Sequence, residues 1–310
     1  MRSSSALFPV SLVAAEVLDH LHDDAYLLNP GVSQDPSVRV AVSRLTDPAW
    51  DVGRQGPRVP VVLLHSEFHN RHQWLGSDSQ GLARQLARAG YDVWMPEMRG
   101  HGRSPRNTHW RSNQVSDYVQ QDWPAVLAFV AEQSGEAFWL GQGLSALSLA
   151  QMLVSAPGEA ARVRGAVFIE PGEPRRHWLQ KQLSRRTRWR LSRRHSVSGT
   201  WGPEEEPAAL LRTLFTLHRR ARRGDSHPVY GQLRRVSTPS LVISNGNDDP
   251  AREFSGLLGA QSRRTLLRHS ANSQGPLPPA CQPPDGKTAL TLLEWLQEQQ
   301  AGHSHYREAL

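Results

Sequence analysis

Residues 141–145 (GQGLS) have the clearest chemical interpretation in the sequence, because of what lies on each side of them. The apolar run 137–140 (AFWL) before them is typical of a buried strand, and residues 144–154 after them are typical of a helix. A sharp strand–turn–helix of the form G-x-S-x-G presents its central side chain as a nucleophile. Here the central residue is Gly143, so we expect a turn that forms easily but carries no side chain to react.

Nucleophilic acyl transfer also needs a base near the nucleophile and a carboxylate that orients the base. The chain order nucleophile, acid, histidine is met by Gly143, Asp249 and His269. Asp249 follows a predicted strand, with Asp248 as the alternative acid. His269 ends the predicted last strand, and an ordinary strand-end histidine is an equally good interpretation of it.

The elements that must position these residues alternate along the chain. Strands separated by helices require right-handed crossovers, so we predict an α/β fold with a mainly parallel sheet covered on both faces. Residues 38–45 alternate as a half-buried edge strand does, and residues 122–125 (DWPA) are typical of a helix start with a capping aspartate. The predicted strands are 38–45, 59–65, 91–95, 137–140, 163–169, 241–244 and 265–267, and the predicted helices begin near 82, 122, 144 and 288.

Taken in order, several motifs between residues 59 and 249 resemble the α/β-hydrolase superfamily, specifically its bacterial serine esterases and lipases. They are residues 65–74 after a strand, the loop 99–104 (RGHGRS), the turn 141–145 and residues 246–250 (GNDDP). The resemblance implies the α/β-hydrolase fold and assigns Gly143 to the position where the family has serine. It also supports Asp249 as the acid, because G-x-x-D-P is a family pattern.

The resemblance leaves two positions open. A shifted frame would make Ser145 the nucleophile, but it would put Ser145 in the first helical turn and Leu147 where a small residue is needed. The family histidine would fall either at His269 or where this chain has residues 273–275 (SQG).

The oxyanion hole of the family consists of two backbone N–H groups, which the resemblance assigns to Glu67 and Leu144. Relatives begin this loop with His-Gly, whereas this chain has His65 followed by serine, a poorer fit if the loop needs a glycine conformation. The carboxylate of Glu67 would oppose an oxyanion if it turned inward, and we expect it to point to solvent instead. By resemblance His65 and His101 belong to the rim of the site.

Composition restricts the other classes of function. The net charge is +7, and no run approaches the roughly 18–20 apolar residues of a membrane-spanning helix. We expect no metal site, because the cluster His65, His69 and His72 lacks the H-E-x-x-H spacing, and no cofactor, because no phosphate-binding glycine motif is present.

The segment 185–194 (RRTRWRLSRR), from Arg185 to Arg194, could contact an anionic surface. A solvated amphipathic lid helix is the simpler interpretation, and no specific nucleic-acid binding is expected.

We divide the chain into an N-terminal extension with a short helix (1–37), an α/β-hydrolase core (38–170 and 236–300), an inserted lid (171–235) and a tail (301–310). The pattern of residues 6–21 is interpreted as an amphipathic helix, with a secretory signal as the weaker alternative, so the cytoplasm is the expected location.

Three hypotheses on function follow. In the first, ester hydrolysis is lost or strongly reduced and the protein binds an ester-like or acyl ligand. In the second, it is an active hydrolase that uses Ser145, or water activated by His269 and Asp249. In the third, it is a non-catalytic binding module with an anion-binding arginine-rich lid. The oligomeric state stays open.

Overall fold

The computed structural model describes residues 4–31, 33, 35–50, 57–76, 80–171, 196–197, 202–210, 230–245, 249–259, 262–267 and 286–308. The arginine-rich segment 185–194, Asp248, His269 and residues 273–275 lie outside these ranges. Most of the predicted lid, 171–235, also lies outside them. The expectations on those residues therefore stay predictions.

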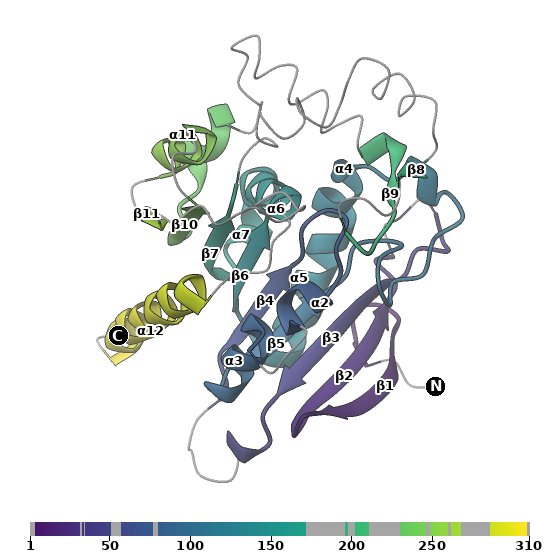
Figure 1. Ribbon diagram of the computed structural model, residues 1–310, viewed down its shortest axis with the longest axis horizontal. Helices are drawn as coiled ribbons and strands as arrows, with labels where there is room; N and C mark the ends of the chain where they lie inside the picture. Colours follow the sequence, from purple (N-terminus) through teal and green to yellow (C-terminus); the bar gives the residue numbers. More distant parts are fainter. Residues whose placement is uncertain are drawn as a thin grey trace.

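Within the described ranges, nine strands form one sheet (Figure 1). They are β1 (Val10–Leu18), β2 (Leu21–Leu28), β3 (Val40–Thr46), β4 (Pro60–Leu64), β5 (Asp92–Pro96), β6 (Ala137–Gln142), β7 (Val163–Ile169), β10 (Ser240–Asn245) and β11 (Ser262–Leu267). Their order in space is β1-β2-β3-β5-β4-β6-β7-β10-β11. Neighbours from β1 to β5 are antiparallel, and neighbours from β5 to β11 are parallel. The predicted α/β class with a mainly parallel sheet is confirmed.

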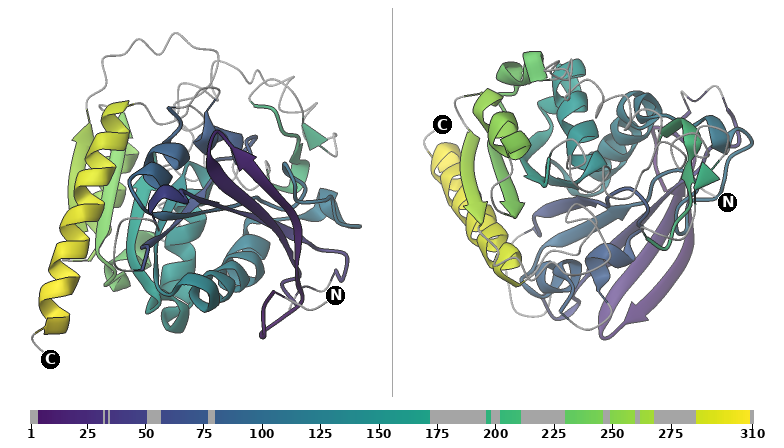
Figure 2. Two further views of the ribbon diagram at one scale, coloured as in Figure 1. Left: turned by 90° about the horizontal axis from the view of Figure 1, so that it is seen from below. Right: turned by 45° about the horizontal axis from the view of Figure 1, so that its top comes forward.

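Helices cover both faces of this sheet (Figure 2). The helical segments are α2 (His72–Leu75), α3 (Leu82–Arg88), η1 (Trp110–Ser112), α4 (Val115–Asp117), η2 (Tyr118–Asp122), α5 (Trp123–Ser134), α6 (Leu144–Ser155), α7 (Pro157–Ala160), η3 (Tyr230–Arg235), α11 (Asp249–Leu257) and α12 (Gly286–Glu308). Side chains of α5, α6 and α11 form one apolar core, and those of α2, α3 and α12 form the other.

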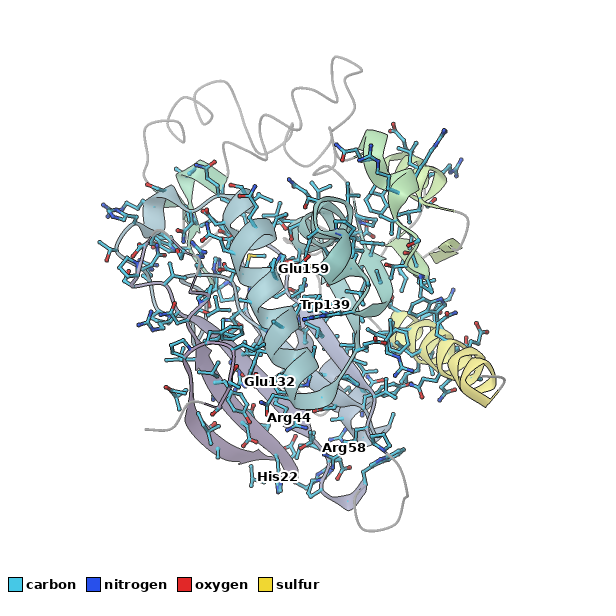
Figure 3. All side chains as sticks on the ribbon, turned by 180° about the vertical axis from the view of Figure 1, so that it is seen from behind. His22, Arg44, Arg58, Glu132, Trp139 and Glu159 are labelled. Atoms are coloured by element: carbon cyan, nitrogen blue, oxygen red, sulfur yellow. The ribbon has the colours of Figure 1, made fainter. Side chains whose placement is uncertain are left out.

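The alternation of side chains along β6 shows how one strand supplies both cores. Phe138 and Leu140 belong to the core beneath α3 and α12, whereas Trp139 belongs to the core beneath α5 and α6. All three are fully buried. Seen from behind, α5 crosses the sheet near Trp139 (Figure 3). A central strand of this kind is an almost continuous apolar run, which is the pattern that the sequence analysis used.

The N-terminal region corrects one prediction. Residues 10–28 are not a helix but a β-hairpin, in which β1 pairs antiparallel with β2. The two residues between the strands, Asp19 and His20, have φ values of +56° and +85°. Two consecutive positive φ values are typical of the tight hairpin turn whose twist matches the flanking strands.

The hairpin also corrects the prediction for residues 38–45. β3 is not an edge strand, because β2 pairs with one side of it and β5 with the other. Only one of its seven residues is not buried. The edge of the sheet is β1, on which Leu12, Val13 and Val17 are exposed.

Two helices differ from prediction in their ends. The helical path into α5 begins earlier, with α4 and a π-helical turn (η2), and Asp122 does not cap α5. Its carboxylate instead accepts hydrogen bonds from Arg99. The last helix, α12, extends beyond the predicted 288–297 and includes most of the predicted tail.

The stretch between β7 and β10 contains a second small sheet, in which β8 (Ser196–Val197) pairs with β9 (Glu206–Pro207). We refer to residues 202–210 as the cap segment. β9 contacts η1. In Figure 1 it lies above the strands β1 to β3. Among the described residues, no helix is both long enough and apolar enough to cross a bilayer.

Candidate functional site

The turn between β6 and α6 has the predicted frame, with Gly143 at its centre. Gly143 has φ +59° and ψ −122°, a backbone conformation that favours glycine. Its N–H donates to the carbonyl of Ile169 on β7 at 3.0 Å. A Cβ atom at Gly141 would lie 2.8 Å from the backbone of Ala146, so strand and helix approach too closely for a side chain there. The turn is thus a tight strand-to-helix junction at the carboxyl end of a central strand.

Ser145 lies in the first turn of α6 and is fully buried. Its hydroxyl donates to the carbonyl oxygen of His65 at 2.5 Å. The hydroxyl of Ser145 therefore binds the loop after β4 through a backbone carbonyl. Among the contacts of the described residues, it is not hydrogen-bonded to a histidine ring.

His65 is buried and links two loops of the described region. Its Nδ1–H donates to the carbonyl of Ser66 at 2.9 Å, and its Nε2 accepts the N–H of Met98 at 3.0 Å. A ring that donates at one nitrogen and accepts at the other is neutral. Burial lowers the pKa of His65 well below its ordinary value, with the nearby His101 acting in the same direction. His65 therefore joins the segments after β4 and β5 without carrying charge.

The loop after β4 is also joined to the turn through two glutamines. The N–H of Ser66 donates to Oε1 of Gln73 at 2.8 Å, and Nε2 of Gln73 donates to Oε1 of Gln142 at 2.8 Å. All three residues are buried. Ser66 does not have the positive φ that favours glycine; in this loop that conformation is adopted by Phe68, with φ +61°. The expected conflict at Ser66 is thus absent.

Glu67 differs from expectation, because its side chain points inward. Glu67 is only 7% exposed, and its Oε2 accepts the N–H of Leu144 at 3.0 Å. Leu144 directly follows the central glycine of the turn. Burial raises the pKa of Glu67 to about 7, although the N–H groups of Leu144 and of Glu67 itself stabilise the charged form. Of the two N–H groups that the resemblance assigned to an oxyanion, that of Leu144 is therefore hydrogen-bonded to this carboxyl group, and that of Glu67 stabilises its charged form.

This raised pKa predicts a pH dependence of stability. Between about 4.5 and about 7 the folded protein keeps a proton on Glu67 that the unfolded chain has released. The free energy of unfolding therefore falls as pH rises through this window, by at most about 3 kcal/mol for this group. Glu67→Gln should remove that part of the slope when urea unfolding is compared at about pH 5 and about pH 8. Parallel profiles for the two proteins would contradict the prediction.

His101 pairs with a carboxylate that the sequence analysis did not identify. Its Nε2–H donates to Oε1 of Glu206 at 3.1 Å and its Nδ1–H to the carbonyl of Arg99 at 3.1 Å, with His101 and Glu206 fully buried. A carbonyl and a carboxylate both act as acceptors, so these two contacts favour the doubly protonated, imidazolium form of the ring. Burial alone would lower the pKa of His101, but the charge and hydrogen bond of Glu206, the charge of Glu204 and the carbonyl of Arg99 together raise it.

The cap segment fixes the loop after β4 through Phe68. Oε1 of Glu206 accepts the N–H of Phe68 at 2.7 Å, and the N–H of Glu204 donates to the carbonyl of Phe68 at 3.0 Å. A Cβ atom at Gly202 would lie 2.1 Å from the same carbonyl. Positive φ at a bulky residue costs on the order of 1–3 kcal/mol and persists only where its surroundings impose it. The contacts on both sides of Phe68 provide those surroundings.

The predicted acid and base are less fully placed. Asp249 is the first residue of α11, directly after the carboxyl end of β10 and its connection. That end belongs to the same edge of the parallel sheet as the turn at Gly143. His269 and the alternative acid Asp248 lie outside the described residues, so the predicted triad stays a prediction.

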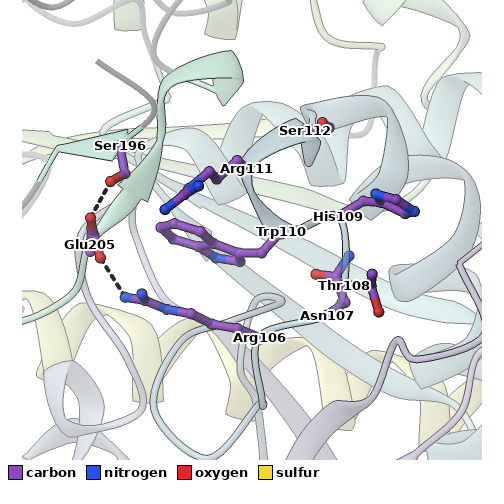
Figure 4. A pocket seen from close by; sticks show the side chains of 9 residues that line it. All are labelled: Arg106, Asn107, Thr108, His109, Trp110, Arg111, Ser112, Ser196 and Glu205. Atoms are coloured by element: carbon purple, nitrogen blue, oxygen red, sulfur yellow. Dashed lines mark hydrogen bonds and ion pairs between the residues drawn. The ribbon is translucent and has the colours of Figure 1, made fainter.

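A cavity of about 340 Å³ lies at the rim, between residues 106–112 and the strands β8 and β9 (Figure 4). The guanidinium of Arg106 stacks 4.1 Å from the ring centre of Trp110 and pairs with Glu205 at 2.6 Å. The hydroxyl of Ser196 donates to the same carboxylate. The cavity is lined by Arg106, Asn107, Thr108, His109, Trp110, Arg111, Ser112, Ser196 and Glu205. The residues that line this cavity do not include the turn at Gly143.

Three functional candidates escaped the sequence analysis: Glu206, Gln73 and Phe68. Glu206 lies in the run 203–207 (PEEEP), whose ordinary interpretation is a solvated charged surface. Nothing in the spacing of the three glutamates indicates that the last of them is the buried one. Within the described part of the chain, no group of three potential ligand side chains could bind a metal ion.

Comparison with known proteins identifies a family for most of the chain. The profile of a family described as "Alpha/beta hydrolase family" matches residues 61–308. Mouse lipase member N is 29% identical over 115 residues, which are 34% of this chain and 29% of that protein. The chain thus aligns with less than a third of that relative's length.

Solved structures are similar over most of the chain. A candidate lipase from Sulfolobus solfataricus has a TM-score of 0.59 at 14% identity, covering 95% of this chain and all of that one. A structure from a study of carboxylesterases of Nitrososphaera gargenis has a TM-score of 0.58 at 16% identity, covering 87% and 98%. At such low identity these likenesses establish the fold alone.

Proposed function

Since the chain belongs to the alpha/beta hydrolase family, we propose that it retains an esterase-like scaffold that binds an ester-like or acyl ligand, with ester hydrolysis absent or strongly reduced. The similarity to lipases supports ester-like compounds as the class of ligand. The cytoplasm remains the proposed location.

The observation that carries the proposal is the position of Gly143. It is the central residue of the turn between β6 and α6, where a serine nucleophile of this family would stand, and glycine has no hydroxyl to attack a carbonyl. Loss of a nucleophile removes most of the rate of such an enzyme and leaves a residual of roughly 10³–10⁴ over water. Binding of a ligand does not need the hydroxyl, so it can persist without turnover.

The competing hypothesis is an active hydrolase that uses Ser145 or water activated by His269 and Asp249. For Ser145 it faces a specific difficulty, because the hydroxyl already donates to the backbone of His65 in a fully buried position. His269 lies outside the described residues, so the water-activation part of this hypothesis stays a prediction.

A chromogenic short-chain ester assay tests the proposal. We expect the purified protein to hydrolyse the ester at a rate close to that of buffer, and His269→Ala and Ser145→Ala to give the same rate. Turnover well above buffer that disappears in His269→Ala would overturn the proposal in favour of water activation. Turnover that disappears in Ser145→Ala would identify that hydroxyl as the nucleophile.

A further inference from the structure

The inward carboxylate of Glu67 occupies the position that the carbonyl oxygen of a reacting ester would take in an oxyanion hole. An oxyanion hole acts by directing preorganised N–H groups at the oxygen on which charge develops. The N–H of Leu144, directly after the centre of the turn, is 3.0 Å from Oε2 of Glu67. The N–H of Glu67 also stabilises the carboxylate. The N–H of Leu144 therefore already has an acceptor supplied by the protein, and the N–H of Glu67 stabilises the charged form of the same side chain.

We propose that the side chain of Glu67 is an internal occupant of the oxyanion hole and excludes the carbonyl oxygen of an ester from it. The inference rests on the proposed function and goes further, because it assigns a second obstacle to hydrolysis that is independent of the missing hydroxyl at Gly143. The residue that determines whether an ester carbonyl can bind is then Glu67.

Two kinds of contact keep the carboxylate in this position. The backbone of the loop is fixed, because His69 donates from Nδ1 to the carbonyl of Glu67 at 2.9 Å and the next residue, Phe68, contacts the cap segment on both sides. The side chain itself is almost fully buried, so it has no open solvent into which to turn.

The charges around Glu67 are mixed. His65 and His69 approach from its own loop; burial lowers the pKa of both, so neither adds a full positive charge at neutral pH. Glu206, from the cap segment, opposes the charge of Glu67 and is itself paired with His101. The hydrogen bonds from the backbone therefore matter most for the ionised carboxylate, which is the form that blocks an oxyanion most strongly.

Serine restored at the turn provides the first test. We expect Gly143→Ser/Glu67→Ala to hydrolyse a chromogenic short-chain ester about 10²-fold faster or more than Gly143→Ser alone, since one oxyanion donor is typically worth about 10²–10³ in rate. Gly143→Ser/Glu67→Gln should stay closer to Gly143→Ser, because the amide oxygen can still accept the N–H of Leu144. Equal rates for Gly143→Ser and the double variant with alanine, with either rate above that of buffer, would overturn the proposal.

A second measurement decides the matter if every serine variant is silent. In the otherwise unchanged protein, labelled with ¹⁵N-leucine, the amide signal of Leu144 should move as Glu67 titrates, with its assignment made through Leu144→Met. Glu67→Gln should abolish that pH dependence, and Glu67→Ala should move the signal at every pH. A Leu144 signal that responds in the same way in all three proteins would refute the internal occupant. This readout does not involve hydrolysis, so an active wild-type protein would overturn the proposed function without affecting it.

Discussion

Replacing Arg99 by methionine is expected to lower the free energy of unfolding by about 3–5 kcal/mol, because it leaves a buried carboxylate without its partner. Nε of Arg99 donates to both carboxylate oxygens of Asp122, at 3.0 and 2.8 Å, and one terminal nitrogen donates to Gln121 at 2.6 Å. The side chains of Arg99 and Asp122 are 4% and 1% exposed. Urea unfolding at neutral pH measures the loss.

An exposed ion pair of the same loop provides the control. Arg103 pairs with Glu16 at 2.9 Å, with side chains 30% and 56% exposed, and such pairs are worth about 1 kcal/mol or less. Arg103→Met should therefore cost much less than Arg99→Met. The double variant Arg99→Met/Asp122→Leu should recover part of the loss, because no charge is then left buried. Equal losses in Arg99→Met and Arg103→Met would contradict the prediction.

Replacing Glu206 by alanine is expected to cost about 3–5 kcal/mol at acidic pH, because it leaves the buried imidazolium of His101 without its carboxylate. The N–H of Phe68 loses its acceptor as well. The cost depends on pH with a defined sign. The pKa of His101 is raised in the folded protein, so the stability that the pair provides is fully present below about 6.5 and is lost as pH rises through the higher folded pKa.

Urea unfolding of wild type and Glu206→Ala at about pH 5.5 and about pH 8.5 tests this prediction. The difference between the two proteins should be larger at the lower pH. Glu205→Ala is the matched control, since the neighbouring carboxylate pairs with Arg106, whose side chain is 53% exposed. Its cost should be about 1 kcal/mol or less. A Glu206→Ala cost that is independent of pH would show that His101 is not the partner that matters.

The core of the fold is predictable because its strands are buried on both faces. The runs that became β4, β6 and β7 are almost entirely apolar, with Arg164 in β7 and Gln142 at the end of β6 as the exceptions, so they could be recognised without knowing which strands they pair with. The turn at Gly143 is equally predictable from the sequence. A side chain at Gly141 would collide with the backbone of α6, and Gly143 has a positive φ, so both positions favour glycine.

The hairpin of β1 and β2 could not be read in the same way. Most positions of β1 are exposed, and Leu12, Val13 and Val17 are among them, so the strand shows no clear alternation of polar and apolar residues. Ala14 and Ala15 also favour helix. The turn uses Asp19 and His20, without the glycine that usually indicates a hairpin. Tertiary pairing with β3 decided the structure against local propensity.

The site illustrates a second limit of sequence interpretation. Glutamate is rarely buried, so pointing Glu67 to solvent was the reasonable expectation. Its burial depends on backbone N–H groups at Leu144, 77 residues away along the chain. Every residue except proline has such a donor, so the sequence does not indicate which of them a buried side chain will contact. For the same reason the pairing of His101 with Glu206, 105 residues away, could not be inferred.

The bond between His101 and Glu206 joins the cap segment to the core, and this has a thermodynamic consequence. The charge and the hydrogen bond of Glu206 are the main causes that raise the pKa of His101 against the effect of burial. Any displacement of the cap segment that separates the two residues returns the ring to an environment that favours its neutral form. Exposure of the region beneath the cap is therefore coupled to the release of a proton, and alkaline conditions favour the displaced state. The same displacement breaks the hydrogen bonds of the cap segment to the N–H and to the carbonyl of Phe68. Movement of the cap segment and the conformation of the loop after β4 are therefore coupled.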